Sequence, residues 1–165
     1  MGYLDNSGLY IKIGPEVAVP STGGEYKTYA ELREIEFTLN LANPTYTFGA
    51  TNYIINDNLF FPTGVRIQEV ETVVDTAATG ATATFDLGLM RTDRTTVTSA
   101  TAFLAAVTVA SLATVGTKAV VSTGGTFAGA LIGTTTASVN YVTLRVNTAN
   151  FTAGVVKIRI RYYRS

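Results

Sequence analysis

Closely spaced carboxylates are the side chains of this 165-residue chain with the most capacity for chemistry. They form three candidate pairs: Glu34 with Glu36, Glu69 with Glu71, and Asp86 with Asp93. Glycosidases use such pairs, and residues two apart on a strand lie about 6.5–7 Å apart on one face. Both glutamate pairs alternate with apolar residues, which is the pattern of an ordinary solvent-facing strand. We therefore expect these carboxylates to be structural and predict no catalytic residues.

Histidine and cysteine are absent from the sequence, which excludes Ser-His and Cys-His catalysis and thiolate metal sites. The stretch "NDN" at residues 56–58 offers a single carboxylate, too few for a calcium loop. The Gly-rich "STGG" occurs at Ser21 and Ser122, but neither copy is followed by Lys and a helix, as a phosphate loop requires. We expect a protein that is not an enzyme and that has neither a metal site nor a cofactor.

A row of cations closes the chain in "GVVKIRIRYYRS". Alternation places Lys157, Arg159, Arg161 and Tyr163 on one strand face, with the intervening aliphatic residues on the other. All twelve acidic residues lie at or before Asp93, so residues 1–93 sum to −7 and residues 94–165 to +7. Like charges at this spacing repel one another unless acidic groups lie opposite, so the row needs a partner.

Two acidic rows have the matching spacing, Glu34 with Glu36 and Glu69 with Glu71. The last strand of a sandwich commonly returns beside an early one, so we predict Arg159 or Arg161 beside Glu34 or Glu36 in the same chain. The alternative is pairing between copies or within a larger assembly, which makes these residues candidate interface residues. Loop aromatics add further interface candidates, or a sugar-stacking platform: Tyr46, Phe48 and Tyr53.

Strand patterns dominate the sequence. A period of two runs through "LREIEFTLNL", "ATFDLGLMR", "NYVTLRVN" and "VVKIRIRYY", and a phase change in "GVRIQEVETVV" predicts a bulge near Gln68 and Glu69. Shorter strand-forming runs are "GLYIKI", "NLFF", "TKAVVS" and "FAGALIG". One short helix is expected over "ATAFLAA", with Ser99 as its N-cap. Gly- and Thr-rich turns separate the runs, and the spacing is that of an all-β sandwich or barrel.

The length fits a β-sandwich domain over residues 25–165, preceded by an arm or loop segment at residues 1–24. A pI near 6.2 and zero net charge argue against direct nucleic-acid binding. The uncharged stretch 95–117 is diluted by Thr and Ser, so we expect no membrane span.

The segments "GEYKTYAELREIEFTLNL", "NLFFPTGVRIQEVETVV", "ATFDLGLMRTDRTT" and "GVVKIRIRYYRS" resemble the small virion structural proteins of tailed bacteriophages. The resemblance implies a jelly-roll-like antiparallel β-sandwich and a capsid cement or decoration protein. It further implies a homotrimer that binds the major capsid protein on the capsid surface of a virion, after synthesis in the bacterial host cytoplasm. The alternative is a carbohydrate-binding or host-surface-binding sandwich module of a phage tail or neck.

Overall fold

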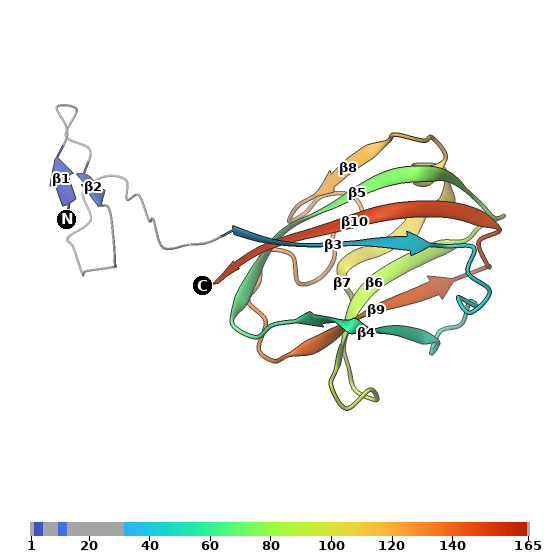
Figure 1. The fold of residues 1–165 in the computed structure, drawn as a ribbon, viewed down its shortest axis with the longest axis horizontal. Coiled ribbons are helices and arrows are strands. Elements are labelled where there is room, and N and C mark those ends of the chain that lie inside the picture. Colours follow the sequence, from blue (N-terminus) through green and yellow to red (C-terminus); the bar gives the residue numbers. More distant parts are fainter. Residues whose placement is uncertain (1, 5–9, 13–31, 165) are drawn as a thin grey trace.

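The computed structural model describes residues 2–4, 10–12 and 32–164, and two four-stranded antiparallel sheets form its body (Figure 1). The first sheet has the order β3-β10-β5-β8 and the second the order β4-β9-β6-β7. Their strands are β3 (Leu32–Asn40), β4 (Tyr53–Phe61), β5 (Val65–Thr79), β6 (Thr84–Arg91), β7 (Val97–Thr108), β8 (Lys118–Val121), β9 (Asn140–Asn147) and β10 (Ala153–Arg164). A separate pair joins β1 (Gly2–Leu4) to β2 (Tyr10–Lys12), and a 3-10 turn, η1, spans Val109–Leu112.

The strand order is that of a jelly roll. In each sheet the sequence-distant strands are neighbours: β3 lies beside β10, and β4 beside β9. Eight strands arranged as two such sheets form the two Greek keys of this fold. The predicted jelly-roll-like antiparallel sandwich is therefore confirmed. The predicted arm or loop at residues 1–24 falls largely outside the described residues.

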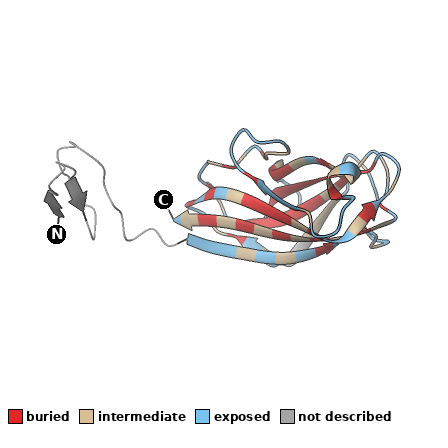
Figure 2. Ribbon diagram, turned by 90° about the horizontal axis from the view of Figure 1, so that it is seen from above, coloured by how far each residue is buried: buried red, intermediate tan, exposed pale blue. Residues whose placement is uncertain are grey.

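The core lies between the sheets and follows from alternation. On β10, Val156, Ile158 and Ile160 are fully buried while the residues between them are half-exposed, and Figure 2 shows this red and tan banding along the strands. Phe61 packs edge-on against both Phe103 and Tyr162, with ring centroids 5.0 and 5.1 Å away. Each large apolar side chain buried in this way contributes about 1.5–3 kcal/mol.

The predicted bulge in β5 is confirmed. Arg161 of β10 lies opposite Glu69, but the next residue, Tyr162, lies opposite Ile67, so Gln68 is the extra residue. The bulge keeps Ile67 and Val70 on the core side of one strand although they are three residues apart.

The predicted helix beginning at Ser99 is wrong, because this segment is strand β7. Its backbone pairs with β6 and also receives the segment 127–131, where the N–H groups of Gly129 and Leu131 donate to the carbonyls of Phe103 and Ala102. These tertiary hydrogen bonds outweigh the helix propensity of its alanines. The run "FAGALIG" (127–133) is accordingly a bridging turn segment rather than the strand expected.

Candidate interaction surfaces

The register of the first sheet places charged side chains of opposite sign side by side on its outer face. Strand β10 lies between β3 and β5, with Arg159 opposite Glu36 on one side and Glu71 on the other. Two residues along, Arg161 lies between Glu34 and Glu69. The predicted pairing of the last strand with the early strand is thus confirmed. We call the set joined by ion pairs the charge ladder: Glu34, Glu36, Glu69, Glu71, Lys118, Arg159 and Arg161.

The two arginines act as bridges across three strands. Arg159 donates from Nε to Glu36 and from Nη1 to Glu71 Oε1, the latter at 2.8 Å. Arg161 donates from Nε to Glu34 at 2.9 Å and from Nη1 to Glu69 at 2.6 Å. Because each guanidinium uses both edges of its planar fork, the ladder fixes the register of β3, β10 and β5 together.

Glu71 is the centre of the ladder, and its side chain is fully buried beneath the cations. Lys118 Nζ lies 2.8 Å from one of its oxygens, and Arg159 and Arg161 contact it at 2.8 and 3.3 Å. The hydrogen bond from Lys118, followed by that from Arg159, lowers the pKa of Glu71 against the opposing effect of burial. The pKa of Glu36 is also lowered, chiefly by its hydrogen bond from Arg159.

The charges proposed for contacts between copies are therefore largely paired within one chain. Lys157 differs, since it lies opposite Thr38 and Val73 and forms no ion pair with a described carboxylate. Tyr163 lies half-exposed at the far end of the same face, between Leu32 and Arg66. Lys157, Tyr163 and the exposed Val120 of β8 are among the groups on this face that lie alongside the ladder.

The three loop aromatics are not gathered into a single platform. Tyr53 stacks under the guanidinium of Arg145, 5.6 Å from its ring centroid, on the outer face of the second sheet. Phe48 is 53% exposed in the loop before β4. Tyr46 instead lines a cavity between the sheets. The sugar-stacking arrangement that they could have formed is therefore not built.

A buried ion pair that the sequence did not lead us to expect lies near Tyr53. Asp86 is 3% exposed, and it accepts hydrogen bonds from Arg145, Asn147 and the backbone N–H of Ala106. The Ala106 backbone has a φ of 50°, and the Asp86 carboxylate holds this strained residue of β7 in place. The signal in the sequence was one charge of each sign, Asp86 and Arg145, in two otherwise uncharged strand cores.

The sandwich has one closed and one open side. On the side of β7 and β8, residues 128–136 cross the gap and bond to both sheets, through Gly129 to β7 and through Gly133 and Thr136 to β5. On the opposite side, β3 and β4 are the edge strands, and each has a described strand neighbour on one side only.

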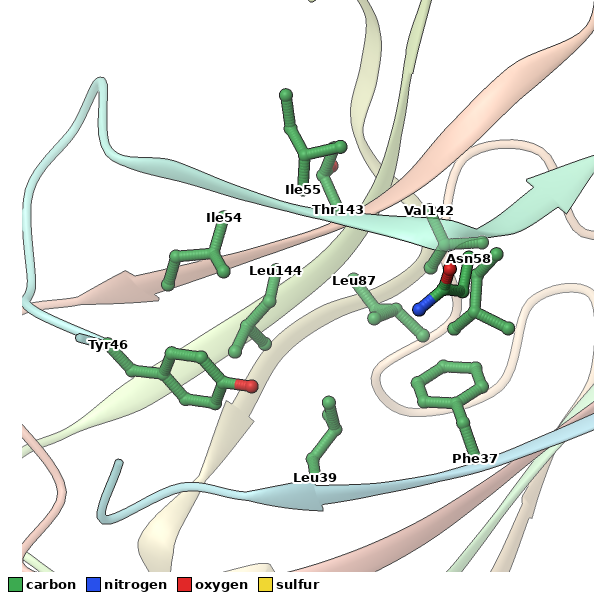
Figure 3. Close-up of a pocket in the computed structure, with 11 residues that line it drawn as sticks. Phe37, Leu39, Tyr46, Ile54, Ile55, Asn58, Leu87, Val142, Thr143 and Leu144 are labelled. Carbon is green, nitrogen blue, oxygen red and sulfur yellow. The ribbon is translucent and has the colours of Figure 1, made fainter. Parts of the chain in front are cut away.

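A cavity of about 300 Å³ lies between the sheets at the open side. Figure 3 shows Phe37 and Leu39 of β3 facing Ile54, Leu87 and Leu144 of the second sheet across it, with the Tyr46 hydroxyl directed into the space. It forms where β4 departs from β9, because Ile55 pairs with Thr143 but Phe60 pairs with Tyr141. Thr143, also in the lining, is buried, and its hydroxyl has no hydrogen-bond partner among the described residues. Most of the lining side chains are aliphatic, and Asn58, Thr143 and Tyr46 add polar groups.

The carboxylate pairs serve structural roles. Both glutamate pairs belong to the charge ladder, and Asp86 is bound by Arg145. Asp93 caps its own turn by accepting hydrogen bonds from the N–H groups of Thr95 and Thr96, and these bonds hold its pKa well below the ordinary range.

Within the described residues, no group of three acidic, His or Cys side chains is placed to hold a metal ion. No helix among these residues is long and apolar enough to cross a bilayer.

A chain of a solved phage capsid has this fold. A chain of the capsid of Ralstonia phage GP4 superimposes with a TM-score of 0.53 at 17% identity, covering 94% of this chain and 98% of that chain. A chain in the capsid asymmetric unit of cyanophage Pam1 gives a TM-score of 0.48 at 19% identity, covering 92% of this chain and 94% of that one. The acid-stable capsid of Helicobacter pylori bacteriophage KHP30 gives 0.44 at 18% identity, covering 81% and 86%. No protein-family model and no curated protein sequence matches the chain.

Proposed function

We propose that this protein is a structural component of a bacteriophage virion, a cement or decoration protein that binds the assembled head as a homotrimer. The observation that carries the proposal is the end-to-end correspondence with a chain of the Ralstonia phage GP4 capsid, which covers 94% of this chain and 98% of that one. The phrases quoted above, which resemble tailed-phage virion proteins, support the same assignment independently of the coordinates.

The surface chemistry supports a role in adhesion. Charged residues make up 15% of the chain, below the ~25% usual for soluble domains. The charge ladder joins seven of them in ion pairs within one sheet face. Burying such a face in an interface costs less than burying unpaired Lys or Glu, since its ions keep their partners. Lys157, Tyr163 and the loop residue Phe48 remain available for contacts with the major capsid protein or another copy.

The proposed action is mechanical and follows from mass action. A protein that binds the assembled shell but not its free subunits stabilises the shell by RT ln(1 + [L]/Kd) at each site. A rigid sandwich suits this role, because little conformational entropy is lost when a preformed surface docks. Many copies then multiply a modest contact energy over the whole head.

Co-sedimentation with heads tests the proposal. Purified protein is added to expanded heads that lack it, and the heads are pelleted and the bound copies counted by quantitative mass spectrometry. We expect saturable binding, with a copy number that is a multiple of three per symmetry-equivalent site, and no binding to free capsid subunits. Absence of the protein from pelleted heads at micromolar concentration, together with a monomeric mass in solution, would overturn the assignment.

A further inference from the structure

The cavity at the open side of the sandwich has walls from both sheets. Its volume is about 300 Å³, and its lining comes from β3, β4, β6, β9 and the loop before β4. Phe37 and Leu39 of the first sheet face Leu87 and Leu144 of the second across it (Figure 3). A protein cavity of about 150 Å³ holds benzene, so this space suits a molecule of about twelve non-hydrogen atoms.

The cavity opens where β4 gives up part of its pairing with β9. Ile55 lies opposite Thr143 and Phe60 lies opposite Tyr141, so residues 56–59 of β4 stand against a single residue of β9. An irregularity of this size costs backbone hydrogen bonds between the two strands. Such departures from regular pairing are common beside functional sites, which makes this cavity the first place to look for a ligand.

Polar groups line the two ends of this apolar space. Figure 3 shows the Tyr46 hydroxyl directed into it at one end and the Asn58 amide at the other, with leucine side chains between them. The Thr143 hydroxyl in the same lining is buried and has no hydrogen-bond partner among the described residues. None of the described lining side chains is charged. These walls fit a neutral molecule with an apolar body and a hydrogen-bonding group, because a charge buried here would find no ionic partner.

We propose that this cavity is a binding site for a small neutral molecule, with an apolar body of about two fused rings and a hydroxyl or carbonyl group that hydrogen-bonds to Tyr46. The apolar body lies between Phe37 of the first sheet and Leu87 of the second, and it adds contacts between the sheets on the side opposite the bridging segment 128–136. An aliphatic side chain inserted from another protein would leave the Tyr46 hydroxyl without a partner, which favours a small molecule. This inference does not depend on the virion role.

Fluorescence titration of the full-length chain with 2-naphthol tests the inference. This probe has the proposed size, no charge and one hydroxyl group. The sequence contains no tryptophan, so the probe can be excited without a background from the protein. We expect a single saturable site per chain with a Kd of about 0.1 mM or below. Absence of saturable binding up to about 1 mM 2-naphthol would overturn the proposal, whether the space is closed or is filled by protein.

Two matched variants locate the bound probe. Ile54→Phe directs a larger side chain into the cavity and should weaken 2-naphthol binding by about tenfold. Thr38→Phe places the same ring on the exposed outer face of β3 and should leave the affinity unchanged. Thermal melting without the probe shows that both variants are folded. Equal affinities in the two variants would place the probe elsewhere and contradict the proposal.

Tyr46→Phe isolates the hydrogen bond, because it removes the hydroxyl and keeps the ring. We expect this variant to bind 2-naphthol about fivefold more weakly than the parent chain does. Naphthalene, which has no hydroxyl, should bind the two proteins equally well. An unchanged affinity for 2-naphthol would show a cavity that accepts apolar molecules without a polar contact, and would contradict the proposed role of Tyr46.

Discussion

Arg159 donates hydrogen bonds to Glu36 on one neighbouring strand and to Glu71 on the other, so a single side chain ties β3, β10 and β5 together. The two acceptors differ in their surroundings, since the side chain of Glu36 is 43% exposed and that of Glu71 is 0% exposed. Water can therefore replace the contact between Arg159 and Glu36, but it cannot replace the contact between Arg159 and Glu71.

Glu71→Gln should destabilise the fold more than Glu36→Gln does. The substitution leaves Lys118, Arg159 and Arg161 around a neutral amide instead of the carboxylate that they share, at a cost of about 2 kcal/mol, less than for a fully buried pair because these cations are partly exposed. The ion pair of the exposed Glu36 is screened by water, so its loss should cost less. Urea unfolding midpoints of the two variants measure the difference. Equal midpoints would show that burial does not distinguish the two ends of the ladder.

The ladder also predicts acid sensitivity. The folded-state pKa of Glu71 lies below its ordinary value of 4.5, so its stabilising contribution is fully present above about pH 4.5. That contribution is lost as the pH falls through the lower folded pKa, where the folded state must also take up a proton. Unfolding free energy measured between pH 6 and pH 2 should fall less steeply in Glu71→Gln than in the parent chain. Parallel curves would contradict the assignment.

Asp93→Ala should loosen the hairpin between β6 and β7. The carboxylate accepts from the N–H groups of Thr95 and Thr96 and from the Thr96 hydroxyl, and these bonds lower its pKa. Without this acceptor the two backbone N–H groups lose their partner in the turn, so the melting temperature should fall. Asp93→Asn is the matched control, because its side-chain oxygen can still accept and should recover most of the stability. If both variants melt alike, the capping role is wrong.

Gly88→Ala should be among the most damaging small substitutions. A Cβ at this position would collide with the backbone carbonyl oxygens of Ser99 and Ala100, where β7 folds over β6. Backbone cannot move aside as a side chain does, so we expect a loss of about 3 kcal/mol. Gly125→Ala, whose nearest contact would be 3.1 Å from the Ser122 carbonyl, is the milder comparison. Thermal melting of the two variants gives the result, and similar melting temperatures would argue against the crossing of β7 over Gly88.

The elements predicted correctly are those whose two-residue period fixes a buried and a charged face. This is why the ladder could be placed: alternation defined the faces of "EIEFT" and "KIRIR", and jelly-roll closure brought them side by side. The Ser99 segment failed because its alanines favour a helix locally, whereas part of its hydrogen bonding comes from residues 127–131, which are distant in sequence. The pair Asp86 and Arg145 was missed for a related reason, since 59 residues separate them. The cavity depends on the departure of β4 from β9 between Ile55 and Phe60. In the sequence, that part of β4 contains the polar run "NDN" (56–58).

The stability of heads with and without the protein tests the central claim most directly. Expanded heads are titrated with the purified chain, and their disassembly temperature is followed by light scattering. If the protein binds the assembled shell but not the free subunits, the disassembly temperature should rise with the concentration of the protein and level off once its sites are saturated. A disassembly temperature that stays constant at saturating concentrations would contradict a cementing function.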